Sequence, residues 1–184
     1  MKTALVLTGC LAISTAIPTG AWAGGYLGVA LGSEPGINDE FLKGEGQPLG
    51  RSLRGLAGIR FGHVSLEGAL NGFTVLTNNF GEKTAYQLSA AAKLNLPLGN
   101  GFEAFARAGL ERTWLNQSDA RNQAVDLMGD GYLVGGGFEY HIDALIANAS
   151  LFVDYNVHHA TLDSPRITVT ATEQIWGLGI LVGF

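Results

Sequence analysis

The sequence predicts an all-β protein, an eight-stranded antiparallel up-and-down transmembrane β-barrel. Large apolar residues alternate with small or polar residues in eight stretches, and this period of two is typical of strands, whose successive side chains point to opposite faces. Hydrophobic residues make up 47% of the chain and charged residues 15%, yet no apolar run of 18 residues follows residue 23. A transmembrane helix is therefore excluded, whereas strands can cross a membrane once they close into a barrel.

The eight stretches are separated by connections that are alternately long and short. The predicted strands span residues 24–32, 53–62, 64–71, 84–96, 102–114, 131–141, 146–158 and 173–184. Short turns are predicted at residues 62–63, 97–101 and 142–145, and long polar loops at residues 33–52, 72–83, 115–130 and 159–170. This regular alternation is expected of a membrane barrel with both termini on one side, and a soluble β-sandwich does not predict it.

The first 23 residues are interpreted as a secretory signal peptide, which leaves residues 24–184 as the barrel domain. Lys2 precedes a mostly apolar stretch over residues 4–17, and an A-x-A cleavage site ends at Ala23. A lipoprotein signal around Cys10 is a weaker alternative, because that cysteine leaves too little room for an apolar region. Cleavage would remove one lysine and the only cysteine, so the mature chain would carry 10 basic and 16 acidic residues, a net charge of −6.

The closing strand, residues 173–184, has two contrasting faces. Its apolar face carries Trp176, Leu178, Ile180, Val182 and Phe184. Glycine dominates the other face, at Gly177, Gly179 and Gly183. A nearly bare face suits the crowded interior of a narrow barrel. An amphipathic closing strand that ends in an aromatic residue resembles the C-terminal signature of bacterial outer-membrane β-barrel proteins.

The glycine-rich segments 102–109 and 135–140 look similar to the small eight-stranded group typified by the OmpA transmembrane domain. The resemblance implies an outer-membrane protein of a Gram-negative bacterium, with periplasmic termini and four extracellular loops. It also implies three partners: outer-membrane lipid, lipopolysaccharide and the barrel-assembly machinery, which would recognise Phe184 as an insertion signal. Nucleic acid is not expected to bind an exported chain of this acidity.

The alternation places a set of charged residues on one face. They are Arg60, Glu67, Lys93, Glu103, Arg107, Glu111, Glu139 and Asp154. A cation facing lipid at the membrane midplane costs about 2–4 kcal/mol, so we expect this face to line the lumen as a network of ion pairs. A gated ion path is the alternative, although eight strands leave an interior only wide enough for side chains.

Aromatic residues fall mostly near strand ends or on the outward face, where they predict interfacial girdles. They are Tyr26, Phe61, Tyr86, Phe102, Trp114, Tyr132, Phe138, Tyr140, Tyr155, Trp176 and Phe184.

A weak catalytic candidate lies at the start of the fourth long loop, where His158, His159 and Ser164 come close in sequence. Lipid hydrolysis would need a base within reach of a hydroxyl and an orienting carboxylate. The His-x-Ser-Asn pattern of the lipid A deacylase family is absent. A metal site on the two histidines is disfavoured, because adjacent strand residues point to opposite faces.

We therefore expect no cofactor, no metal and no catalysis, and a structural or surface-interaction role with an unidentified extracellular ligand. Two alternatives remain open: a lipid-modifying enzyme of the lipid A deacylase or acyltransferase type, and a narrow channel for small solutes.

Overall fold

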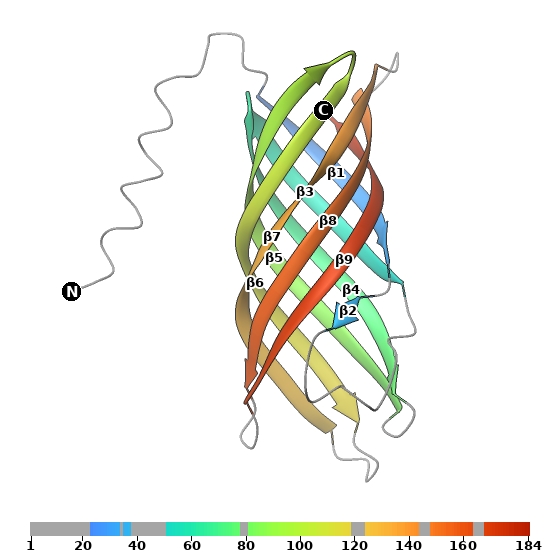
Figure 1. Ribbon diagram of the computed structural model, residues 1–184, viewed down its shortest axis with the longest axis vertical. Helices are drawn as coiled ribbons and strands as arrows, with labels where there is room; N and C mark the ends of the chain where they lie inside the picture. Colours follow the sequence, from blue (N-terminus) through green and yellow to red (C-terminus); the bar gives the residue numbers. More distant parts are fainter. Residues whose placement is uncertain are drawn as a thin grey trace, which may run out of the picture.

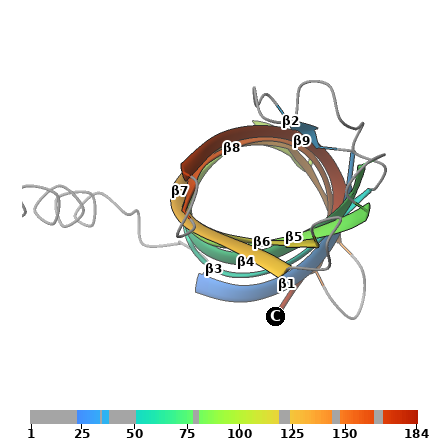
Figure 2. The ribbon, with the colours of Figure 1, turned by 90° about the horizontal axis from the view of Figure 1, so that it is seen from below.

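The computed structural model describes residues 23–33, 35–37, 51–77, 81–118, 124–143, 148–163 and 168–184. Within these ranges, eight long strands form one closed antiparallel barrel (Figure 1), which Figure 2 shows as a complete ring. They are β1 (Ala23–Gly32), β3 (Ser52–Phe61), β4 (Val64–Thr77), β5 (Gly81–Gly99), β6 (Phe102–Ser118), β7 (Ala124–Asp143), β8 (Asn148–Asp163) and β9 (Thr168–Gly183). The two-residue strand β2 (Gly36–Ile37) pairs with β9 at Gln174 and Glu173, just beyond the segment of β9 that pairs with β1. The predicted fold class is confirmed.

The first and last strands close the barrel. Each strand pairs with its neighbour in sequence, and β1 also pairs with β9 from Tyr26 opposite Gly183 to Gly32 opposite Gly177. This pairing satisfies the backbone groups of both edge strands, as a membrane interior requires. Except for Ala23, the predicted signal peptide lies outside the described residues.

Two short turns show why glycine and asparagine occur where they do. Gly62 has a φ of 61° in the turn between β3 and β4. In the turn between β5 and β6, Gly99, Asn100 and Gly101 have φ values of 93°, 55° and 80°. Positive φ is cheap for glycine and tolerated by asparagine, which allows these tight connections. The short turns and the C-terminus lie at the upper end of Figure 1, the end that the resemblance predicts to be periplasmic.

The strands extend further at the other end than we predicted. The predicted loops at 72–83, 115–130 and 159–170 were wrong over much of their length. Instead, β4 ends at Thr77 and β5 begins at Gly81. Likewise β6 ends at Ser118 and β7 begins at Ala124, while β8 ends at Asp163 and β9 begins at Thr168. Polar composition was the reason for predicting loops. Outside the membrane, however, a strand can carry polar residues on its outer face and keep its pairing.

We call the extended ends of β6, β7, β8 and β9, opposite the short turns, the collar, defined as residues 115–118, 124–131, 156–163 and 168–175. In β9 the collar adds eight residues beyond Trp176. At ~3.3 Å per residue and a tilt of ~40°, they rise about 20 Å above the girdle. The collar is therefore paired sheet rather than loop.

The outer face of the barrel below the collar is apolar. Its exposed side chains include Leu27, Val29, Leu66, Leu88, Leu94, Leu110, Leu178 and Ile180. Aromatic rings border this band at both ends, with Tyr155 against Trp176 toward the collar and Phe102 against Tyr140 at the periplasmic end. Tyr26 is a correction to the predicted girdle, because its side chain is buried in the lumen. Among the described residues, no helix has the length and hydropathy needed to cross a membrane.

Candidate functional site in the barrel lumen

The predicted charged residues project into the lumen. Seven of them are buried: Glu67, Lys93, Glu103, Arg107, Glu111, Glu139 and Asp154. The eighth, Arg60, has a side chain 27% exposed near the periplasmic mouth. Their positions follow from the register, since alternate residues on every strand of a barrel share the interior face.

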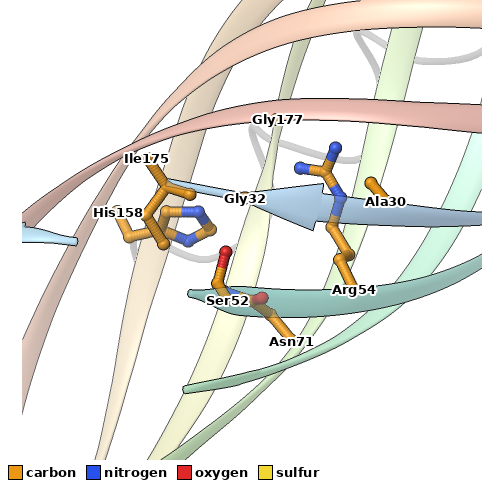
Figure 3. A pocket seen from close by; sticks show the side chains of 8 residues that line it. All are labelled: Ala30, Gly32, Ser52, Arg54, Asn71, His158, Ile175 and Gly177. Atoms are coloured by element: carbon orange, nitrogen blue, oxygen red, sulfur yellow. The ribbon is translucent and has the colours of Figure 1, made fainter. Parts of the chain in front are cut away.

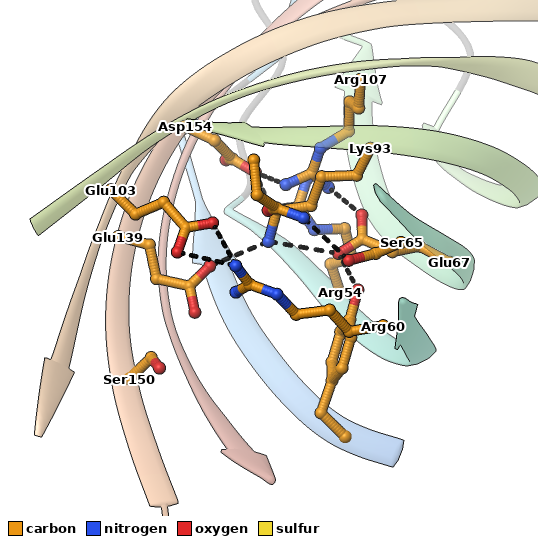
Figure 4. Close-up of polar contacts among 12 residues, drawn as sticks. Arg54, Arg60, Ser65, Glu67, Lys93, Glu103, Arg107, Glu139, Ser150 and Asp154 are labelled. Carbon is orange, nitrogen blue, oxygen red and sulfur yellow. Dashed lines mark hydrogen bonds and ion pairs between the residues drawn. The ribbon is translucent and has the colours of Figure 1, made fainter. Parts of the chain in front are cut away.

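A chain of ion pairs crosses the middle of the lumen, and we call it the lumen network (Figure 4). Lys93 Nζ lies 2.8 Å from Glu139 Oε2 and 3.6 Å from Glu67 Oε1. Arg107 continues the chain, 3.3 Å from Glu67 and 3.0 Å from Asp154. The network thus joins strands β4, β5, β6, β7 and β8 across the barrel.

Sequence reasoning missed Arg54, which completes the lumen network by pairing with Asp154. The signal was present, because Arg54 stands six residues before Arg60 and so falls on the same face of β3. The predicted strand 53–62 already contained Arg54, but the predicted charged set did not include it. Two cations therefore share the Asp154 carboxylate, one from β3 and one from β6.

Aromatic rings pack against the cations of the network. Lys93 Nζ lies 4.4 Å from the ring centroid of Phe105, and the Arg107 guanidinium lies 4.9 Å from the same ring. The Tyr26 hydroxyl donates to Glu67 Oε1 over 2.8 Å. These contacts give the desolvated charges partners other than water, which buried ions require.

A second polar layer lies beside the lumen network, at the level where the collar begins. Gln87 Nε2 donates to Glu173 Oε2 over 2.7 Å, and Asn71 Nδ2 donates to Gln87 Oε1 over 3.0 Å. His158 Nδ1 lies 2.6 Å from Glu111 Oε2. Gln87 was predicted on the same strand face as Lys93, whereas Glu173 was left out of the predicted charged set although it alternates with outward residues.

The lumen turns apolar at its extracellular end. The buried side chains there are Phe73, Ala85, Leu127, Ala160 and Leu162, with Leu115 packed against them. This apolar layer stands between the polar interior and the extracellular side.

The space left inside is small. One cavity, of about 10 Å³, is lined by Arg54, Asn71 and His158 among others (Figure 3), and a second has about 20 Å³. Each has room for about one water molecule. Among the described residues, side chains therefore fill most of the lumen around these two cavities.

The predicted catalytic residues do not meet. His158 points into the lumen and bonds Glu111, whereas His159 points outward, 2.9 Å from the Thr172 hydroxyl and stacked on Tyr132. Ser164 lies outside the described residues. Both histidines belong to β8, not to a loop, so their opposite directions follow from strand geometry. No group of three or more metal-ligating side chains is assembled among the residues described.

Residues 3–184 match the family model described as the outer membrane protein beta-barrel domain. The chain belongs to this family. The match spans every barrel strand, so the apolar band faces the lipid of an outer membrane, the termini are periplasmic and the collar is extracellular.

Solved structures of small barrels share the fold. Neisserial surface protein A superposes with a TM-score of 0.68 at 14% identity, over 87% of this chain and 97% of that one. The N-terminal β-barrel domain of OprF from Pseudomonas aeruginosa gives 0.56 at 12% identity, over 89% and 100%. Ail from Yersinia pestis, in complex with the heparin analogue sucrose octasulfate, gives 0.56 at 11% identity, over 88% and 99%. No curated protein matches the sequence.

Proposed function

We propose that the protein is a non-conducting barrel whose main role is structural or interactive, exerted at the cell surface by the collar and the loops. The observation that supports this most directly is the filled lumen. Ion pairs occupy its middle and apolar side chains its extracellular end, with cavities of only about 10 and 20 Å³ between them. A solute path would require many of these contacts to break together.

The collar offers the surface for such a role. Its outward residues Thr161, Asp163, Thr168 and Thr170 are exposed on neighbouring strands β8 and β9. Backbone pairing holds them in place, so a ligand would meet a preorganised surface. A polyanion such as the sulfated sugar bound to Ail is a poor candidate here, because the mature chain would carry a net charge of −6.

The proposed partners in the membrane follow from the lipid-facing band and the closing strand. Phospholipid and lipopolysaccharide would surround the exposed leucines, and the assembly machinery would recognise β9 with its terminal Phe184. These partners require no cofactor and no metal.

Conductance across a planar bilayer tests the proposal. The purified protein should give no stepwise current above that of the bilayer, and removing the collar loops should not create one, because the ion pairs lie deeper. Reproducible single-channel steps from the unaltered protein would favour the channel alternative instead. Lipid A profiles of cells with and without the protein should be identical, and a change in acyl chains would revive the lipid-modifying alternative.

A further inference from the structure

The periplasmic mouth of the lumen holds a serine, a histidine and a glutamate in series. Ser150 Oγ lies 2.9 Å from His141 Nδ1, and His141 Nε2 lies 2.9 Å from Glu103 Oε2. His141 and Ser150 are directly opposite each other on β7 and β8, while Glu103 comes from β6. We call these three residues the mouth triad.

The hydrogen-bond roles within the mouth triad can be assigned from the groups themselves. An ionised carboxylate only accepts, so Nε2 of His141 donates to Glu103. In the neutral imidazole, Nδ1 is then an acceptor and receives the Ser150 hydroxyl proton. The order of serine, imidazole and carboxylate is the one in which a serine is activated as a nucleophile and the carboxylate orients the base. The two ring nitrogens exchange their usual roles here, because Nδ1 faces the serine and Nε2 faces the carboxylate.

Arg60 holds the orienting carboxylate. Its Nη2 lies 3.0 Å from Glu103 Oε1 and 3.1 Å from Oε2, and its Nε donates to the Gly62 carbonyl over 2.8 Å. Glu139 is the other charged group near the histidine, with Oε1 3.7 Å from His141 Nδ1. Arg60 thus fixes the carboxylate that orients His141.

Strand β8 carries two further histidines, and each of them lacks either the hydroxyl or the carboxylate partner. Among the described hydrogen bonds, His158 has a carboxylate partner and no hydroxyl, and His159 has the Thr172 hydroxyl and no carboxylate. A purely space-filling network would need no such order of serine, base and acid. Within the part of the chain that the structure describes, only His141 contacts both a hydroxyl and a carboxylate through its two ring nitrogens.

We propose that the mouth triad is a serine esterase site that opens toward the periplasm. Ser150 Oγ attacks the ester carbonyl while His141 takes its proton. The resulting tetrahedral adduct expels the alcohol, which receives that proton from His141. Water, deprotonated by His141, then attacks the acyl-serine, which releases the carboxylic acid and returns the proton to Ser150. This activity is additional to the surface role proposed above and does not depend on it.

The exposure of the triad sets the class of substrate. The His141 side chain is 36% exposed, but Ser150 is only 7% exposed. A long acyl chain or a whole lipid would not fit beside the filled lumen, so the site would take short acyl esters of water-soluble alcohols, such as acetyl esters.

The test uses the protein purified from outer membranes in detergent, with heat-modifiable gel mobility to show that each variant is folded. A fluorophosphonate probe should label Ser150, identified by mass spectrometry, and p-nitrophenyl acetate should be hydrolysed. Ser150→Ala should abolish both, and His141→Gln should reduce the rates about 10²–10⁴-fold, the usual contribution of a general base. The control is Thr172→Ala, which removes the hydroxyl that contacts His159, a histidine with no carboxylate partner among the described hydrogen bonds. Its labelling and hydrolysis rates should equal those of the unaltered protein.

The pH dependence and a thiol variant separate catalysis from a structural role. Labelling should rise with pH as His141 loses its proton, under the combined influence of Glu103, Glu139 and Arg60. Ser150→Cys should react with iodoacetamide faster when His141 is present than in the double variant with His141→Gln. Absence of label on Ser150 in the folded protein, or equal labelling without His141, would overturn the proposal.

Discussion

Replacing Lys93 by methionine should destabilise the barrel more than any single change at its surface. The ammonium group lies 2.8 Å from Glu139 and 3.6 Å from Glu67, inside a lumen where all three side chains are about 4% exposed. Methionine has a similar length but no charge. Glu67 keeps Arg107 at 3.3 Å, whereas Glu139 keeps only the distant His141 among the described ion pairs. Removing one partner of a buried pair costs about 3–5 kcal/mol, because the other charge remains desolvated.

Urea unfolding in phospholipid vesicles, followed by tryptophan fluorescence and gel mobility, measures this change in the free energy of unfolding. The matched control is Arg112→Gln, which breaks an exposed ion pair with Asp130 on the outer face and should leave the midpoint unchanged. Adding Glu139→Gln to Lys93→Met should recover part of the loss, because the orphaned charge is removed. If Lys93→Met unfolds at the same urea concentration as Arg112→Gln, the lumen network does not stabilise the fold.

Three further predictions concern packing, the lipid face and assembly. Gly179→Ala should lower the unfolding midpoint, because a Cβ there would lie 2.5 Å from the Phe152 ring and from the Val29 carbonyl; Gly55→Ala, with open space around it, should be tolerated. Ile180→Arg, on the lipid face midway between Trp176 and Phe184, should cost about 2–4 kcal/mol in vesicle unfolding, and a loss close to zero would contradict the assigned membrane position. Phe184→Ser should reduce the fraction of heat-modifiable protein in cells, while the purified chain should still refold in detergent, since the ring is 80% exposed and the backbone hydrogen bonds to Gly25 remain.

The period-two pattern was sufficient to predict the barrel, because the direction of a strand side chain is a local property. It identified the number of barrel strands, the apolar outer face and a face carrying the charges, all of which depend on residues two positions apart. The same pattern placed Tyr26 on the lumen side with Gly28 and Ala30, yet its aromatic character led to a girdle assignment. The structure corrects this, because its hydroxyl finds a buried carboxylate.

The positions at which the strands end could not be predicted from the polarity of the residues. In lipid, a polar outward residue is costly and marks the end of the membrane band, but in water it carries no such cost. Residues such as Thr161 and Thr170 therefore remain in register across β8 and β9 well outside the membrane. The two histidines named as weak candidates illustrate the same point: His158 and His159 belong to a continuing strand, whose geometry sends them to opposite faces.

The sequence by itself thus determined a closed barrel with an apolar exterior, since alternation and hydropathy act over a few residues at a time. Only the tertiary structure decided which charges meet. Arg54 and Asp154 are 100 residues apart, and Glu103 lies 38 residues from His141. Their contact is decided by the register between strands and by the closure of β1 onto β9, which bring opposite walls of a narrow lumen within reach of one another.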